Sequence, residues 1–268
     1  MERRSFEHEG LTLSFLDSGT EGQLLIALHA HWMEGTTFAP LAAALAPGWR
    51  IVAMDQRGHG HSDHAATYTR NDYLGDLAAL FAYLRPTSPA VLLGHSLGGI
   101  NAYQFAARHP EMVRGLIIED IGTEVSADVS FTRAWQGVFA SREALLERIG
   151  PRLAPYLEDS LRETSQGWRL AFDPQEMESS TQESNGDHWS DWLATTCPAL
   201  LFRGSESRLT TQSQFDQMAL RRPNTILRVL HCGHAVHVDQ PDTFHEIVRE
   251  FLLQFDNPTQ SQPPSPVG

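Results

Sequence analysis

The sequence predicts an α/β fold with a mostly parallel sheet at its centre. Short apolar runs alternate with segments of helical periodicity along most of the 268 residues, and such alternation places helices on both faces of a parallel sheet. One junction is especially informative, because Gly94-His95-Ser96-Leu97-Gly98 follows the apolar run 90–93 and precedes a helical segment. A strand, a sharp turn and a helix in that order are typical of a nucleophile elbow, with Ser96 exposed at its tip.

The predicted elements follow one another in a regular order. Residues 3–17 alternate around Glu9-Gly10 and predict a β-hairpin. Short buried strands are predicted by apolar runs at 24–28, 50–54, 90–93, 116–119, 199–202 and 226–230. Helices are predicted between most of these strands, at 38–45, 72–84, 99–108, 212–220 and 241–255. In a sheet of this kind ligands bind beyond the carboxyl ends of the strands, so candidate site residues are sought there.

The alternation stops between residues 122 and 196, where the pattern turns helical and rich in aromatic residues. We therefore expect a core domain formed by residues 1–121 and 197–256, with a helical cap at 122–196 between them. The aromatic side chains there are expected mainly to build the core of the cap, because Trp and Phe bury readily. The Pro-, Gln- and Ser-rich stretch 257–268 predicts a disordered tail.

Composition excludes several classes of protein. The formal net charge of −13 argues against a nucleic-acid partner, which would need a basic surface. All 20 cationic residues are Arg, so chemistry that needs a lysine, such as a Schiff base or a Walker phosphate loop, is excluded. A small-molecule substrate is therefore expected.

Location and redox state are predicted from what the chain contains. No apolar run approaches the roughly 20 residues that cross a bilayer, and the first residues lack the apolar stretch of a secretory signal. We expect a cytoplasmic protein without a membrane partner. Two cysteines, Cys197 and Cys232, are too few for a disulfide framework and are expected to pack in the core.

A serine hydroxyl needs a base to remove its proton, and the best candidate is a histidine after the last predicted strand. Cys232-Gly233-His234-Ala235-Val236-His237 offers two histidines. His234 is preferred because it follows Gly233 in a loop that leaves a strand end. His237 is expected to start the next helix as a packing or capping residue, since one base is enough.

Several motifs together resemble those of the α/β-hydrolase superfamily, in particular its compact esterase-like members with a cap. The resemblance covers residues 7–255 and implies an eight-stranded sheet with a Ser, acid, His order along the chain. Its motifs here are Leu28-His29-Ala30-His31-Trp32, where relatives carry His-Gly, Asp55-Gln56-Arg57-Gly58-His59-Gly60-His61-Ser62, the elbow, Cys197-Pro198, and Gly233-His234 followed by Asp239 and Pro241.

The resemblance also implies an oxyanion hole formed by two backbone amides, one after the nucleophile and one after the first central strand. These are the amides of Leu97 and His31. Ala30 departs from the usual Gly, and Ala resists the positive φ that Gly accepts. The substrate pocket is expected to include Trp32, His95 and Trp135.

The acid of the triad departs from the family pattern. Relatives carry an aspartate shortly after the strand that corresponds to 199–202, but here Ser207 and Arg208 occupy that region. Two carboxylates remain as candidates to fix the tautomer of His234. Asp120 follows the strand at 116–119, as in some relatives, and is preferred over Glu206 in the later loop.

A metal site built from His29, His31, His59, His61 and His64 is not expected, because no matching Cys or carboxylate spacing accompanies these residues. No cofactor is predicted. The expected function is hydrolysis of a carboxylic ester, lactone or thioester through an acyl-enzyme, with Ser96, His234 and Asp120 as the triad. Two alternatives stay open: a cofactor-free dioxygenase that uses a His/Asp dyad, and a ligand receptor built on the same pocket.

Overall fold

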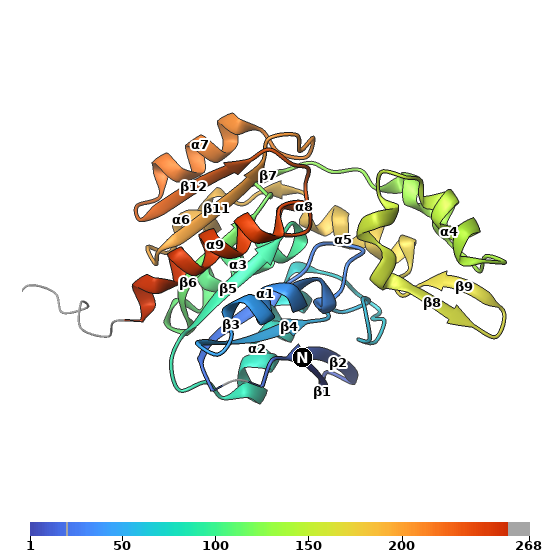
Figure 1. Cartoon of the computed structure of the whole chain (residues 1–268), viewed down its shortest axis with the longest axis horizontal. Helices are drawn as coiled ribbons and strands as arrows, with labels where there is room; N and C mark the ends of the chain where they lie inside the picture. The colour runs from blue at the N-terminus through green and yellow to red at the C-terminus, as the bar shows by residue number, and fades with distance from the viewer. Residues whose placement is uncertain (20, 257–268) are drawn as a thin grey trace, which may run out of the picture.

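A computed structural model describes residues 1–19 and 21–256, and the expected disordered tail at 257–268 lies outside the described residues. Eight strands form one sheet in the order β1-β2-β4-β3-β5-β6-β11-β12 (Figure 1). The hairpin strands β1 and β2 pair antiparallel with each other, β2 is antiparallel to β4, and all later neighbours are parallel. The mostly parallel eight-stranded sheet expected from the sequence is confirmed.

The strands lie close to their expected positions. Their bounds are Glu2–His8 for β1, Leu11–Asp17 for β2, Gln23–Leu28 for β3, Trp49–Met54 for β4, Ala90–His95 for β5, Val113–Glu119 for β6, Ala199–Gly204 for β11 and Thr225–Leu230 for β12. The expectation that the last strand is buried is wrong. Ile226 and Val229 are 40% and 43% exposed, because β12 is an edge strand with one neighbour only.

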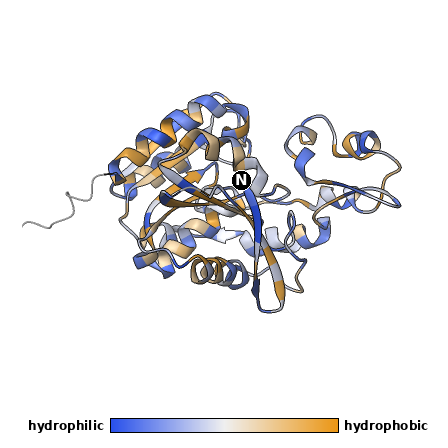
Figure 2. Ribbon diagram, turned by 60° about the horizontal axis from the view of Figure 1, so that its bottom comes forward, coloured by the Kyte–Doolittle hydropathy of each residue, from blue (hydrophilic) through white to orange (hydrophobic). Residues whose placement is uncertain are grey.

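Helices cover both faces of the sheet. On one face α1 (Ala39–Leu45) and α9 (Pro241–Leu252) pack in one apolar cluster with side chains of the central strands. On the other face lie α2 (Arg70–Leu84), α3 (Leu97–Arg108), α6 (Trp189–Leu193) and α7 (Gln212–Arg221). Figure 2 shows hydrophobic residues along the central strands, between helices of mixed polarity. Burial of this apolar surface on both faces is the main force that holds the sheet in place.

The insertion at 122–196 is not purely helical, which corrects the expectation from the sequence. It contains α4 (Arg142–Ile149) and α5 (Pro174–Ser184), several short 3-10 turns, a hairpin of β8 (Leu161–Thr164) and β9 (Gly167–Leu170), and a pairing of β7 (Glu124–Val125) with β10 (Gly186–Asp187). The hairpin escaped sequence reasoning because its strands have only four residues each. Figure 1 shows α4, β8 and β9 to one side of the sheet, beyond the ends of its strands, with α5 nearer to the strands. Apolar residues of this segment form a third cluster that includes Leu97 of the core.

The remaining short helix, α8 (Val236–Asp239), follows β12 directly and precedes α9. Among the described residues no helix is long and apolar enough to span a membrane. Cys197 and Cys232 are free thiols, the former partly buried against the core and the latter buried.

The start of α3 lies unusually close to the end of β3. A Cβ atom added at Gly98 would lie 2.1 Å from the backbone oxygen of Leu28, far inside van der Waals contact. Gly98 thereby lets the helix after Ser96 pack directly against the end of β3.

We predict that Gly98→Ala destabilises the fold by about 1–3 kcal/mol, the usual cost of overpacking a tight interior. Thermal unfolding measured by calorimetry would show the loss as a lower Tm. Gly48→Ala is the matched control, because the nearest atom to its added Cβ lies at 3.9 Å. Equal melting temperatures for both variants would contradict the proposed close packing.

Candidate active site

Ser96 occupies a strained turn between β5 and α3. Its backbone has φ 52° and ψ −113°, a conformation that non-glycine residues rarely adopt. The turn is held because the amide of Ser96 donates to the carbonyl of Glu119 at 3.0 Å and the Ser96 carbonyl accepts from Gly99 at 2.8 Å. The residue is partly exposed, so the hydroxyl group is accessible at the carboxyl edge of the sheet.

His234 and Asp120 meet at the same edge. His234 Nδ1 donates to Asp120 Oδ2 at 2.7 Å, although 114 residues separate the two. Asp120 is fully buried and its other oxygen, Oδ1, accepts from the amide of Gly204 and the hydroxyl of Thr210, both at 3.0 Å. The carboxylate is thus hydrogen-bonded on both oxygens, which fixes its orientation toward His234.

Glu206, the alternative acid, lies elsewhere. Its carboxylate is 60% exposed and 3.6 Å from Nε2 of His231. The family resemblance places the acid in the loop after β11, but here the last residue of β11, Gly204, and Thr210 of that loop donate hydrogen bonds to Asp120. The geometry therefore favours Asp120 and does not place Glu206 at His234.

His31 lies in the loop after β3. His29 anchors this loop, because its Nδ1 donates to the carbonyl of Ala30 at 2.7 Å and its Nε2 accepts from the amide of Gln56 at 3.0 Å. Ala30 needs no positive φ, since the left-handed residue of the loop is Trp32, with φ 71°. The departure from Gly at position 30 therefore leaves the loop intact.

Leu97 is the first residue of α3. Its amide is one of the four at a helix start that have no acceptor within the helix, and the helix dipole adds positive potential there. Such an amide suits a developing oxyanion.

The ring of His31 connects the core to the insertion. Its Nε2 lies 2.8 Å from Oγ of Ser180 on α5, and Ser180 in turn lies 2.8 Å from the hydroxyl of Tyr73 on α2. Burial, followed by the positive charge of Arg70 and by His29, lowers the pKa of His31 to about 3. His31 is therefore neutral at physiological pH and contributes polarity without charge.

Aromatic residues contact one another above the oxyanion loop. Trp32, Phe131 and Trp135 pack edge to face, with ring centroids 5.5–6.1 Å apart. Trp32 and Trp135 belong to the apolar cluster that also contains Leu97. Two of the three expected pocket residues thus lie next to an expected oxyanion donor.

His95 does not line this region, which corrects the third pocket expectation. It is 1% exposed and its ring packs on that of His234 with centroids 4.6 Å apart. Its Nε2 lies 3.0 Å from the carbonyl oxygen of His234, so the side chain faces the loop after β12.

Glu119 escaped sequence reasoning as a contributor to the site, whereas His237 was expected as a packing or capping residue at the start of the next helix and is buried in α8. Glu119 and His237 are hydrogen-bonded to each other, and their potential ligand atoms lie within 4.8 Å of one another and of a nitrogen of His95. We call His95, Glu119 and His237 the inner cluster. Both oxygens of Glu119 already accept from Nδ1 of His237, so hydrogen bonds account for the arrangement. The adjacency of Glu119 to Asp120 was the available signal in the sequence.

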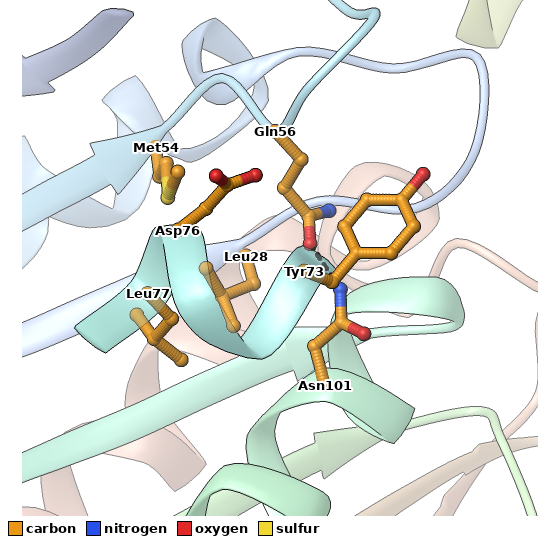
Figure 3. Close-up of a pocket in the computed structure, with 7 residues that line it drawn as sticks. All are labelled: Leu28, Met54, Gln56, Tyr73, Asp76, Leu77 and Asn101. Carbon is orange, nitrogen blue, oxygen red and sulfur yellow. Dashed lines mark hydrogen bonds between the residues drawn. The ribbon is translucent and has the colours of Figure 1, made fainter. Parts of the chain in front are cut away.

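The space between α2 and α3 is not a second binding site. Figure 3 shows Leu28, Met54 and Leu77 on one side and the hydrogen-bonded amides of Gln56 and Asn101 on the other. The gap they enclose has no room for a water molecule. We attribute it to imperfect packing around these polar groups.

Comparisons with known proteins agree with this geometry. The model of the "Alpha/beta hydrolase family" matches residues 25–247. The chain belongs to the α/β-hydrolase family. Among curated relatives of this α/β hydrolase, 2-(acetamidomethylene)succinate hydrolase of Mesorhizobium japonicum is 26% identical over 257 residues, which cover 90% of this chain and 92% of the relative. A protein of Haemophilus influenzae described as a putative esterase/lipase is 25% identical, with 85% and 83% coverage.

The same fold is found among solved structures. E-2-(acetamidomethylene)succinate hydrolase superposes with a TM-score of 0.85 at 24% sequence identity, over 94% of this chain and 98% of the other. With relatives named as hydrolases and esterases, this α/β hydrolase is an esterase-like enzyme.

The low pKa of His31 makes a prediction about acid stability. The unfolded chain takes up a proton at His31 as the pH falls through 6.5, whereas the folded chain does so only near pH 3. The unfolded state therefore binds more protons between these values, and stability is lost as the pH falls through this window. We predict that His31→Gln reduces the loss of Tm between pH 7 and pH 4.5.

The matched control is His231→Gln, since the side chain of His231 is 86% exposed. Melting temperatures followed by circular dichroism across the pH range would decide the matter. If both variants lost Tm as steeply as the unaltered protein, the burial of a neutral His31 would not be a source of acid sensitivity.

Proposed function

We propose that the protein is a serine hydrolase that cleaves a small or medium carboxylic ester, or a related lactone or thioester, through an acyl-enzyme. The observation that carries this proposal is the 2.7 Å hydrogen bond between His234 and the buried Asp120, at the edge where Ser96 lies partly exposed on its strained turn. Nucleophilic acyl transfer requires a base that is oriented by a carboxylate and a serine on the same side of the sheet, and His234, Asp120 and Ser96 all follow strands at that side.

Each residue has a defined role in the proposed reaction. Ser96 Oγ attacks the carbonyl carbon while His234 Nε2 takes its proton, and Asp120 stabilises the resulting imidazolium. The amides of His31 and Leu97 hold the oxyanion. His234 then gives the proton to the departing alkoxide or thiolate, and a water molecule, activated by the same imidazole, releases the acid from the acyl-enzyme.

The apolar surroundings bear on the acyl group. Trp32 and Trp135 lie in one cluster with Leu97, and we propose that they contact the acyl chain. A compact aromatic wall of this kind fits small or medium apolar groups. The name of the Mesorhizobium relative adds one specific candidate, 2-(acetamidomethylene)succinate, to a test panel of esters, thioesters and lactones.

We predict that a fluorophosphonate probe adds once to the unaltered protein, and that the adduct is absent in Ser96→Ala and greatly slowed in His234→Ala. Intact-protein mass spectrometry would measure the adduct, followed by peptide mapping. His231→Ala, an exposed histidine only three residues before His234, is the control and should label at the normal rate. Equal labelling in the Ser96→Ala variant would refute the assignment of the nucleophile.

A separate prediction concerns the acid. Asp120→Asn should lower kcat/KM by about 10³- to 10⁴-fold, because the amide no longer selects the reactive tautomer of His234 or stabilises its cation. Glu206→Gln should leave kcat/KM within about twofold, since Glu206 is exposed beside His231. The assignment fails if Glu206→Gln shows the larger loss.

A cofactor-free dioxygenase is the second candidate function, because the paired His234 and Asp120 would also serve as its base dyad. In that case the Ser96→Ala variant would keep substantial turnover and would consume oxygen, which an oxygen electrode measures. Ligand binding without turnover or labelling would instead favour a receptor.

A further inference from the structure

The inner cluster lies directly behind the proposed triad. Its members are close to the triad along the chain, because His95 precedes Ser96, Glu119 precedes Asp120 and His237 follows His234 by three residues. The exposures of His95, Glu119 and His237 are 1%, 0% and 5%. Burying a carboxylate costs desolvation free energy, which destabilises the fold unless hydrogen bonds and charges compensate for it. A role for Glu119 in the site would explain its position.

Glu119 binds His237 in two ways. Its Oε1 accepts from the backbone amide of His237 at 2.9 Å and from the ring Nδ1 at 2.8 Å, while Oε2 lies 2.9 Å from the same ring nitrogen. Burial acts to raise the pKa of Glu119, but the His237 ring and the hydrogen bonds that His237 donates outweigh it and hold the pKa below its usual value. Glu119 is therefore a charged carboxylate in the interior.

The other side of the His237 ring is also fixed. Its Nε2 lies 2.6 Å from Oγ1 of Thr37, and the ring stacks on Phe38 at 5.0 Å. Thr37 and His237 border a cavity of about 390 Å³ between the loop after β3, the insertion and α8. His237 thus separates the inner cluster from this cavity.

Three hydrogen bonds hold the loop that carries His234, at Gly233, His234 and His237. The amide of Gly233 donates to Asp239 Oδ2 at 2.9 Å, the carbonyl of His234 accepts from His95 Nε2 at 3.0 Å, and the amide of His237 donates to Glu119. Burial keeps the pKa of His95 well below its ordinary value. His95 is therefore neutral, and its single ring proton is the one that reaches the carbonyl of His234.

We propose that the Glu119 carboxylate is a positioning residue for catalysis, which fixes His237 and thereby the loop that aims His234 between Asp120 and Ser96. This inference rests on the proposed function, because it assigns Glu119 a role in the same reaction. General-base catalysis depends on placement within a few tenths of an ångström, and a misplaced base costs rate rather than substrate affinity.

Glu119→Gln tests the proposal, because the amide keeps the size and one acceptor oxygen but loses the charge and presents an NH₂ group to His237. We predict that kcat falls about 10- to 100-fold, the loss typical of removing a group that hydrogen-bonds to and orients a metal-binding histidine. KM should change by less than about threefold. We also predict that the downfield ¹H NMR signal of the proton between His234 and Asp120 shifts or broadens. Glu206→Gln is the matched exposed control and should change neither.

Normal kcat in a folded Glu119→Gln variant, or an unchanged His234 proton signal, would overturn the proposal. Should this variant not fold, Thr37→Val decides, because it removes the hydroxyl on the far side of His237 at nearly constant volume. It should lower kcat several-fold at constant KM, and an unchanged kcat would again overturn the proposal. If Ser96→Ala retains activity the proposed function fails, whereas the NMR signal still reports whether Glu119 positions His234.

Discussion

The site depends on one hydrogen bond, between Nδ1 of His234 and the carboxylate of Asp120. The two residues follow β12 and β6, which are separated in the sheet by β11. Their contact therefore requires that β11 lie parallel between the two strands and that the end of β11 leave room for the loop that carries His234. Gly204 provides this room, because an added Cβ would lie 1.8 Å from the carbonyl oxygen of Gly233.

Strain is concentrated at the same edge of the sheet. Ser96 and Asp120, at the ends of the neighbouring strands β5 and β6, both have positive φ values, 52° and 45°. Such conformations cost free energy and persist only where the surroundings fix them. Hydrogen bonds from the Ser96 amide to Glu119 and from the Asp120 amide to Phe202 provide that constraint. The packed sheet thus stabilises two turns that would be unfavourable in isolation.

Most of the core could be predicted from the sequence, because strand and helix periods differ and the glycines around Ser96 have few alternative explanations. The pairing of Asp120 with His234 was also within reach, since strand order brings the end of β6 near the loop after β12. The position of His95 was not. Its adjacency to Ser96 suggested a pocket residue, but the side chain is buried against the ring of His234. Hydrophobic periodicity does not reveal which residue a buried side chain contacts.

The insertion was predicted least well, and the reason is physical. Its elements are short, and β8 and β9 have only each other as neighbours in their sheet. Their conformation depends on tertiary contacts such as the pairing of Phe139 with Trp168, rather than on local propensity. The same holds for the link from His31 through Ser180 to Tyr73, which joins three segments that are distant in the sequence.

The place of the acid has a consequence for the rest of the site. With the carboxylate directly after β6, Gly204 at the end of β11 and Thr210 in the loop after it both donate to Oδ1 of Asp120. Asp120 directly follows Glu119, the last residue of β6, so the two carboxylates are fixed relative to each other by adjacent backbone. The two His–carboxylate pairs, His234 with Asp120 and His237 with Glu119, are thereby kept in register, and the orientation of the proposed base becomes a property of the sheet rather than of a surface loop.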